Sequence, residues 1–253
     1  MGSRPERYLD RPTIAALEAF AARLGEGRDG EAARTYAIGD IHGCADKLLS
    51  LLARIGATPS PEHIGKLIFL GDLVDRGPDS AEVVAIVRAL EDLSPIGAVS
   101  CLKGNHEQMM LDWLKHGDSL WFANGGLETI ASFRRGDGEP EIPGDVVEWI
   151  EGLPTWREDG SHIYVHAGLR PGKPYDRQRD QDRLWIREGF LDVDYDFGKH
   201  VIHGHTPILN GPDRRPFRTN IDTGAVYGGA LTAAILKAET PAPIGFVHVQ
   251  ARR

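Results

Sequence analysis

The sequence is short of cysteine, of long apolar runs and of positive charge, and each shortage excludes a class of protein. Only Cys44 and Cys101 occur among 253 residues, too few for a disulfide framework and typical of a reducing compartment. No apolar stretch approaches the ~20 residues that span a bilayer, and residues 1–5 lack the apolar core of a signal peptide. We expect a cytoplasmic protein with no membrane partner, whose two thiols serve as small buried apolar groups.

The formal net charge is -8, so a nucleic acid would be repelled by most of the surface. We therefore expect no nucleic-acid partner, and any anionic substrate has to be held by local positive charge. Apolar residues make up 41% of the chain and charged residues 26%, which is the balance of a folded globular protein. The length suits one large domain, and the sequence leaves the oligomeric state open.

An amphipathic helix is predicted near the start of the chain. Four apolar residues recur there at helical spacing, namely Ile14, Leu17, Phe20 and Leu24. Gly25 ends the pattern, and a Gly-rich segment follows to Gly30. We interpret residues 1–34 as a helical extension with a linker, and residues 35–253 as the main domain.

From Thr35 onward, short apolar strands alternate with helical segments, a pattern typical of βαβ units and a largely parallel sheet. Three strands are predicted, at residues 35–38, 67–70 and 98–102, and each is followed by a polar cluster. The clusters read GDIHG at 39–43, GDLVDRG at 71–77 and GNHE at 104–107. Because loops converge at the carboxyl ends of strands in open α/β sheets, we expect a ligand site at that edge.

The second half of the chain continues this pattern less regularly. A strand at 163–165 ends in His166, and Val201-Ile202 precedes His205. We interpret segments around Ile221, at 231–236 and at 246–249 as strands of a second, mixed sheet. Residues 169–182, rich in Pro, Asp and Arg, are interpreted as a surface loop. The fold class is therefore α/β, with two sheets packed together and flanked by helices.

Six side chains at these strand ends are candidate metal ligands. Two divalent cations about 3.5–4 Å apart need carboxylate and amide oxygens plus neutral imidazoles, with one carboxylate between them. The strand ends supply this set: Asp40, His42, Asp72, Asn105, His166 and His205. Each alone could be an ordinary turn residue or a hydrogen-bonded histidine, but their shared position favours a dinuclear site. We expect Mn²⁺ first, while iron and zinc also accept these ligands.

The clusters GDIHG, GDLVDRG and GNHE, together with HAG at 166–168 and GHTP at 204–207, resemble those of the phosphoprotein phosphatases within the metallophosphoesterases. The resemblance extends over nearly the whole chain from Thr35 and implies that residues 35–253 form a catalytic domain of the metallophosphoesterase type. It implies that Asp40 and His42 hold the first metal and that Asp72 bridges. The remaining ligands of the second metal would be Asn105, His166 and His205.

The same resemblance assigns the groups that handle the substrate. It implies that His106 is the general acid, that Asp75 orients it, and that Arg76 holds a phosphate oxygen. These roles are chemically sound, because a hydroxide held between two cations can attack phosphorus directly and a histidine suits proton delivery near pH 7.

Two further cations are candidate phosphate-binding groups. Arg187 resembles a phosphate-binding arginine of the family, with a surface ion pair to Glu188 or Asp182 as the alternative. Lys103 stands where many relatives have arginine; lysine keeps the charge but loses the planar fork. His203, close to His205, is interpreted as a residue beside the metal ligands.

Three functions are compatible with these residues. The first is hydrolysis of phosphomonoesters, either on proteins carrying phosphoserine, phosphothreonine or phosphotyrosine or on small phosphoesters. The second is symmetrical hydrolysis of dinucleoside polyphosphates, whose enzymes commonly lack the acidic residue before the motif arginine, so Asp75 favours the first function. The third is a silent metal-binding scaffold that recognises partners through its N-terminal helix, which is disfavoured because no catalytic residue is missing.

Overall fold

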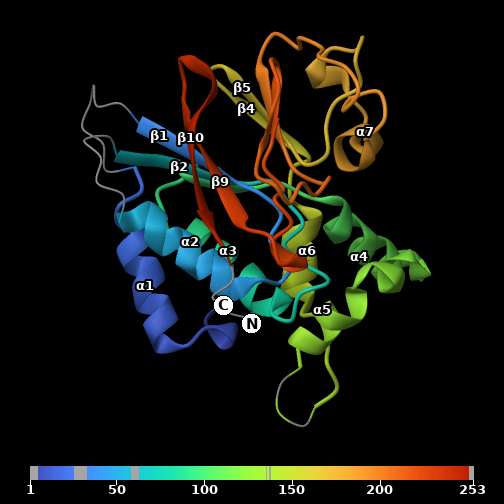
Figure 1. Ribbon diagram of the computed structural model, residues 1–253. Helices are drawn as coiled ribbons and strands as arrows, with labels where there is room; N and C mark the ends of the chain where they lie inside the picture. Colours follow the sequence, from blue (N-terminus) through green and yellow to red (C-terminus); the bar gives the residue numbers. More distant parts are fainter. Residues whose placement is uncertain (1–4, 26–32, 58–62, 135, 137, 251–253) are drawn as a thin grey trace.

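The computed structural model describes residues 5–25, 33–57, 63–134, 136 and 138–250, so the predicted linker up to Gly30 lies outside the described residues. Two five-stranded sheets form its centre (Figure 1). The first has the order β10-β9-β1-β2-β3, with strands β1 (Ala33–Ile38), β2 (His63–Phe69), β3 (Val99–Cys101), β9 (Leu231–Lys237) and β10 (Thr240–Val249). The second has the order β4-β5-β6-β8-β7, with β4 (Trp156–Asp159), β5 (His162–Val165), β6 (His200–His203), β7 (Asp213–Arg214) and β8 (Arg218–Asn220).

Both sheets are mixed, which confirms the predicted fold class and corrects one detail of it. β1, β2 and β3 run parallel, as predicted. β9 then pairs antiparallel with β1, and β10 pairs antiparallel with β9, so both belong to the first sheet. The prediction that residues 231–236 and 246–249 belong to the second sheet was therefore wrong. Ala37 pairs with Ala234 in the antiparallel register between β1 and β9. An apolar strand pattern predicts a strand but does not identify its neighbour.

Helices cover the outer faces. They are α1 (Arg11–Ala21), α2 (Ala45–Ala57), α3 (Ser80–Leu93), α4 (Asn105–His116), α5 (Gly126–Ser132), α6 (Gly144–Glu151) and α7 (Asp180–Trp185). Four short 3₁₀ segments complete the chain, η1 (Pro5–Tyr8), η2 (Ser119–Asn124), η3 (Tyr175–Arg177) and η4 (Ala225–Tyr227). In Figure 1, α1, α2 and α3 lie on one side of the first sheet, while β4 and β5 lie on its other side. The segment 169–182, predicted as a loop, contains η3 and the start of α7.

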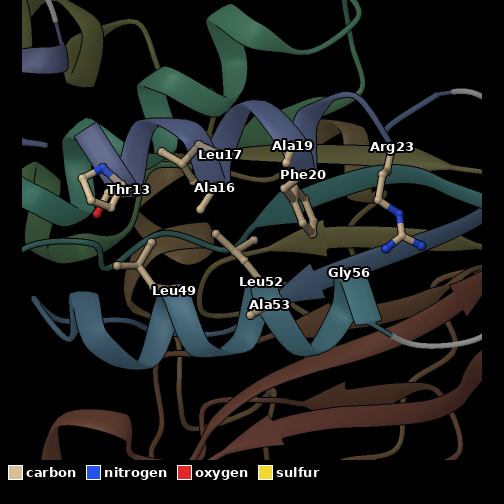
Figure 2. A pocket seen from close by; sticks show the side chains of 11 residues that line it. Thr13, Ala16, Leu17, Ala19, Phe20, Arg23, Leu49, Leu52, Ala53 and Gly56 are labelled. Atoms are coloured by element: carbon tan, nitrogen blue, oxygen red, sulfur yellow. The ribbon is translucent and has the colours of Figure 1, made fainter. Parts of the chain in front are cut away.

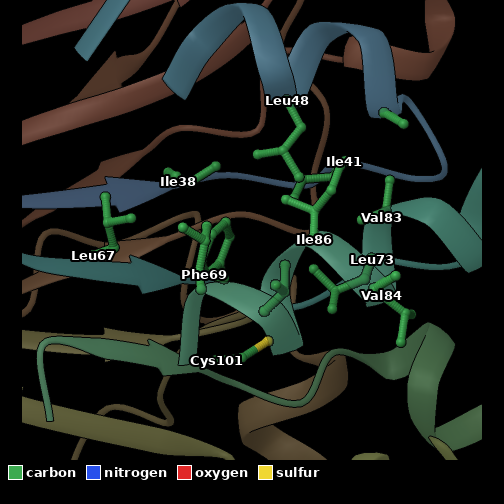
Figure 3. Packing of buried hydrophobic residues seen from close by; sticks show 14 of the residues in the cluster. Ile38, Ile41, Leu48, Leu67, Phe69, Leu73, Val83, Val84, Ile86 and Cys101 are labelled. Carbon is green, nitrogen blue, oxygen red and sulfur yellow. The ribbon is translucent and has the colours of Figure 1, made fainter. Parts of the chain in front are cut away.

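The core is divided by the first sheet because strand residues alternate between its two faces. On the helical face, Ile38, Leu67 and Phe69 pack against residues such as Leu48 and Ile86 from α2 and α3 (Figure 3). The other face packs against the second sheet through a separate apolar cluster, which includes Ala37, Ile68, Tyr164, Ile202 and Ala234. Rigid packing on both faces fixes the strand ends, where the predicted site lies.

Both cysteines are buried free thiols, and burial raises the pKa of Cys44 to about 11. None of the described helices combines the length and the apolar character that a membrane span requires.

The N-terminal helix shares the core of the main domain. Leu17 and Phe20 of α1 belong to the large helical-face cluster, and Leu24 makes a parallel bridge to Ile64 of β2. A groove of about 470 Å³ runs between α1 and α2 (Figure 2). The interpretation of residues 1–34 as a separate extension stays a prediction, but the inner face of α1 is packed as a core element.

Replacement of Phe20 tests how far α1 supports the domain. Phe20 is 6% exposed, so Phe20→Ala should lower the free energy of unfolding by about 3 kcal/mol through lost burial and a cavity. Urea denaturation followed by circular dichroism measures this. Ala19→Ser, at an exposed position of the same helix, should change the midpoint little; an unchanged midpoint in Phe20→Ala would mean that α1 contributes nothing to domain stability.

Candidate active site

The predicted site residues come from the carboxyl ends of five strands in two sheets. Asp40 and His42 follow β1, Asp72 follows β2, and Asn105 begins α4 after β3. His166 follows β5 and His205 follows β6, in the second sheet. The loops are in direct backbone contact, since a Cβ atom at Gly71 would lie 2.5 Å from the amide nitrogen of Gly104. Because the two sheets pack face to face, the predicted site residues from the first and second halves of the sequence lie at the same end of the sheets.

Asp72 lies at the centre of the predicted ligands. Its Oδ2 atom is 3.4 Å from Nε2 of His42 and its Oδ1 atom is 3.4 Å from Nε2 of His166. Two groups of potential metal ligands, with atoms within 4.8 Å of one another, share this residue: His42, Asp72 and His106 form one, and Asp72, His166 and His205 the other. A carboxylate between two imidazoles has the position that a bridging ligand requires.

Asn105 joins the second group. Its Oδ1 atom is 2.9 Å from Nε2 of His166 and 2.8 Å from Nδ1 of His205. All three side chains are buried. The structure therefore brings together an amide oxygen, two imidazoles and the carboxylate of Asp72.

The hydrogen bonds of the histidines direct lone pairs into this cluster. Nδ1 of His42 lies 2.8 Å from the carbonyl oxygen of Val74, and Nδ1 of His166 lies 3.0 Å from that of Leu70. A carbonyl can only accept, so each Nδ1 carries the proton and each Nε2 presents a lone pair. For His166 that lone pair faces the oxygens of Asn105 and Asp72. Hydrogen-bond acceptors that face one another without a proton between them repel, and a cation bound among them would remove that repulsion.

The pKa shifts agree with this arrangement. Burial lowers the pKa of His166 to about 4 and that of His42 well below its usual range, so both rings are neutral at pH 7. Burial also raises the pKa of Asp72 to about 6. Neutral imidazoles and crowded carboxylates are the state that a divalent cation stabilises.

Asp40 meets a second buried carboxylate, Asp222, that the sequence reasoning missed. Burial, and then the charges of Asp222 and Asp72, raise the pKa of Asp40 well above its usual range. Oδ2 of Asp40 accepts from the amide of His205 at 2.9 Å, while the buried Oδ1 has no hydrogen-bond partner among the described residues. An unpartnered carboxylate oxygen beside another carboxylate is a further position that fits a cation. The sequence could have identified Asp222 as a candidate ligand, because Asp222 follows β8 as Asp40 follows β1.

Strained backbone conformations cluster at the predicted site. Among the described residues, the non-glycine residues with positive φ are His42, Asp72, Asp75, Arg76 and His205, with φ between 47° and 74°. This conformation disfavours ordinary side chains and persists where the surroundings enforce it. Every one of these residues is a predicted ligand, catalytic residue or phosphate-binding residue.

Glu107, in the motif GNHE, holds two of the loops together. Its Oε2 atom accepts from the amides of Asp72 (2.9 Å) and Gly104 (2.7 Å). Its Oε1 atom accepts from Leu73 (2.8 Å) and Val74 (3.3 Å). The side chain is fully buried, so these four donors replace the water that a carboxylate would otherwise bind.

The predicted acid and its partner are in contact. Nδ1 of His106 lies 2.6 Å from Oδ2 of Asp75, and Nε2 lies 3.9 Å from Asp72. Burial lowers the pKa of His106 to about 4 and raises that of Asp75 to about 7. Asp75 is fixed by two residues that the sequence reasoning did not assign to the site. The indole of Trp121 donates to it at 2.8 Å and the hydroxyl of Thr129 at 2.7 Å.

The three predicted phosphate-binding cations are placed differently. Arg76 is half-buried, and its Nη1 donates to Nε2 of His42 at 2.6 Å. Arg187 is exposed, but its charge is among the causes that lower the pKa of His205, so it lies within electrostatic reach. Its alternative partner Asp182 instead pairs with Arg170 at 2.5 Å.

Lys103 is turned toward a helix end rather than toward the metal candidates. Its ammonium group donates to the main-chain oxygen of Glu151 at 3.0 Å, at the end of α6. Burial lowers its pKa. In this conformation Lys103 supports α6, and a role in phosphate binding stays a prediction.

The contacts of His203 are with the residue that follows it and with an aromatic ring in the segment after α7. Its Nδ1 atom lies 3.2 Å from the carbonyl oxygen of Gly204, and its ring packs edge-on against Phe190 at 5.0 Å. Burial lowers its pKa to about 3. His203 is therefore a neutral core residue of the second sheet.

Comparisons with known proteins agree with this geometry. A family model described as calcineurin-like phosphoesterase matches residues 33–229. The chain is 33% identical to serine/threonine-protein phosphatase 1 of Salmonella typhimurium, over 79% of this chain and 90% of that protein. It is also 33% identical to the asymmetrical bis(5'-nucleosyl)-tetraphosphatase PrpE of Bacillus subtilis, over 77% and 87%. A solved metallophosphoesterase from Sphaerobacter thermophilus shares the fold, with a TM-score of 0.53, 19% identity and coverage of 87% and 89%.

The central position of Asp72 predicts the effect of its neutralisation. Asp72→Asn removes the charge that two cations would share, so metal content should fall and activity should drop by about 100-fold or more. Elemental analysis after equilibration with Mn²⁺ measures the first effect. Asp176→Asn, at an exposed position, is the control; full metal occupancy in Asp72→Asn would refute the bridging role.

Replacement of Asp222 should have opposite effects with and without metal. Asp222→Asn removes one of two neighbouring buried carboxylates, so the metal-free protein should unfold at a higher temperature. The affinity for Mn²⁺ should fall about tenfold, because the negative charge around Asp40 is reduced. Thermal unfolding across a Mn²⁺ titration separates the two effects. An unfolding temperature that drops equally in both states would show a purely structural role.

Proposed function

Because the chain belongs to the calcineurin-like phosphoesterase family, whose members are metal-dependent phosphoester hydrolases, we propose that it is a phosphomonoesterase acting on phosphoserine, phosphothreonine or phosphotyrosine in proteins. Two divalent cations, when bound, would supply an activated water and offset the charge of the phosphoryl oxygens. We propose Mn²⁺ for both positions. Asp40 and His42 would hold one cation, Asp72 would touch both, and the second would be held by Asn105, His166 and His205.

The observation that carries the proposal is the pair of His106 and Asp75. Hydrolysis of a monoester expels an alkoxide from phosphoserine or phosphothreonine and a phenoxide from phosphotyrosine, and the alkoxide leaves readily only when it is protonated. Nδ1 of His106 is held by Asp75 at 2.6 Å, so Nε2 is the atom free to deliver that proton. Burial lowers the pKa of His106, but the negative charge of a bound phosphate raises it again. The ring would thus be protonated when substrate is present.

Arg76 and Arg187 would bind the substrate. The guanidinium of Arg76 lies beside His42, where it can form two parallel hydrogen bonds with a phosphoryl group. Arg187 is exposed and adds positive charge on the solvent side. A locally positive entrance supports an anionic substrate on a chain whose net charge is -8.

A second candidate is hydrolysis of dinucleoside polyphosphates. The similarity to the asymmetrical tetraphosphatase PrpE supports it, because that relative is as identical to this chain as the serine/threonine phosphatase is. A dinuclear centre serves both reactions, since each one breaks a P–O bond. Asp75 favours the monoesterase, because a positioned proton donor matters most for a poor leaving group.

A panel of phosphopeptides tests the leading function. The Mn²⁺-loaded protein should release phosphate from peptides that carry phosphoserine, phosphothreonine or phosphotyrosine. His106→Asn should lower kcat by about 1000-fold, because the leaving group loses its proton donor. His116→Asn, at an exposed position of the same helix, should retain activity. Release by the wild type no faster than by His106→Asn would defeat the proposal.

Diadenosine tetraphosphate in the same assay separates the two candidates. Chromatography distinguishes two ADP from ATP plus AMP, and so distinguishes symmetrical from asymmetrical cleavage. Production of either pair far faster than phosphate from any peptide would favour the dinucleoside polyphosphate reaction.

A further inference from the structure

The segment between β8 and β9 carries an exposed aromatic ring to the site. Tyr227 is 52% exposed, and its ring centroid lies 5.4 Å from the guanidinium carbon of Arg76. Asp222, beside Asp40, begins the same segment. Residues 222–229, here called the β8–β9 loop, therefore contact one candidate metal ligand and one candidate phosphate-binding residue.

The β8–β9 loop is firmly fixed. Lys47, a buried residue of α2, donates to the carbonyl oxygens of Ala225 (2.5 Å) and Gly229 (2.9 Å). The amides of Tyr227 and Gly229 both donate to the carbonyl oxygen of Gly224 at 2.9 Å. The segment has little room for change, since a Cβ atom at Gly229 would lie 2.0 Å from the oxygen of Thr223. A buried lysine anchors the backbone while the tyrosine side chain is presented to solvent.

A fixed, exposed tyrosine is well suited to bind a ligand. Its ring offers a flat apolar face and loses little conformational entropy on contact. The backbone of the loop is held by Lys47 on its inner side and the ring is 52% exposed, so the ring is available to a ligand. Arg76 lies against the ring, so a phosphoryl group held by that guanidinium would have the ring as its neighbour.

We propose that Tyr227 is a specificity-determining residue that favours phosphoesters with an aromatic ring attached directly to the ester oxygen. This inference rests on the proposed function, since it concerns the leaving group of the same site. The chemical class is an aryl phosphate, which includes the side chain of phosphotyrosine. Tyr227 stacks on the ring of the leaving group, while Arg76 holds the phosphoryl oxygens.

Distance favours an aryl ester over a nucleotide base. The ring of Tyr227 lies against the phosphate-binding group itself, at 5.4 Å from its carbon. The ring of an aryl ester begins one bond beyond the ester oxygen, whereas a base is separated from the nearest phosphate by a ribose. An aromatic ring positioned to stack on a nucleotide base would have to lie farther from Arg76.

Binding of two phosphonates to the Mn²⁺-loaded, full-length protein tests the proposal without turnover. Calorimetry should give an affinity for benzylphosphonate, in which a methylene group replaces the ester oxygen, about tenfold higher than for ethylphosphonate, as expected for one stacked ring pair. In Tyr227→Ala this ratio should fall to near one, and in Tyr227→Phe it should be retained. Tyr195→Ala is the matched control, because Tyr195 is also exposed but precedes β6, at the strand end opposite the site; its ratio should equal that of the wild type.

A ratio near one in the wild type, or an unchanged ratio in Tyr227→Ala, would overturn the inference. A parallel pair, AMP and ribose 5-phosphate, tests the base: loss of preference for AMP alone in Tyr227→Ala would also overturn it. If the phosphonate ratio behaves as expected while no phosphopeptide is hydrolysed, the proposed function fails and the role of Tyr227 stands.

Discussion

The site depends on one buried carboxylate that ties two loops together. Glu107 accepts four backbone amides from the segments after β2 and β3. Such charge-assisted hydrogen bonds are short and strong, and they offset the cost of removing a carboxylate from water. They also fix the backbone of Asp72, whose Oδ1 in turn accepts from the amide of His106 at 3.1 Å. The predicted bridging ligand, Asp72, and the predicted general acid, His106, are thereby positioned by the same connection.

Further backbone contacts between the loops hold the strained residues in place. A positive φ costs free energy, so isolated residues would relax into a commoner conformation. His42 and Asp72 cannot relax, because the amide of His42 donates to the carbonyl oxygen of Asp72 at 2.9 Å and the loops contact each other through glycine. At Gly204 a Cβ atom would lie 1.9 Å from Oδ1 of Asp40. Strain and close packing are thus two consequences of forcing several polar groups into one buried volume.

Sequence patterns predicted the strand-end clusters because each is local: a strand, a glycine and a ligand lie within a few residues. They could not identify contacts made across the fold. Trp121 and Thr129 bind Asp75 from 46 and 54 residues away, and nothing in their surroundings marks them. β9 was recognised as a strand but placed in the wrong sheet, since period-two alternation carries no information about pairing. Asp222 was missed although a strand was predicted around Ile221, just before it, because Asp222 belongs to none of the motifs that carried the resemblance.

The buried metal-ligand candidates indicate the type of reaction, whereas the choice of substrate depends on the more exposed residues around them. The substrate is therefore harder to predict than the reaction. The predicted metal ligands are buried and would contact the cations, so the same set can serve phosphatases and tetraphosphatases, and this chain is 33% identical to one relative of each name. The residues proposed to contact the substrate, Arg76, Tyr227 and Arg187, are exposed or half-buried and would not have to coordinate a metal. Lys103, also predicted to bind phosphate, is instead buried, and its ammonium group donates to the end of α6. A metal-binding set of this kind therefore does not identify the substrate, and substrate choice has to be sought in the side chains around it.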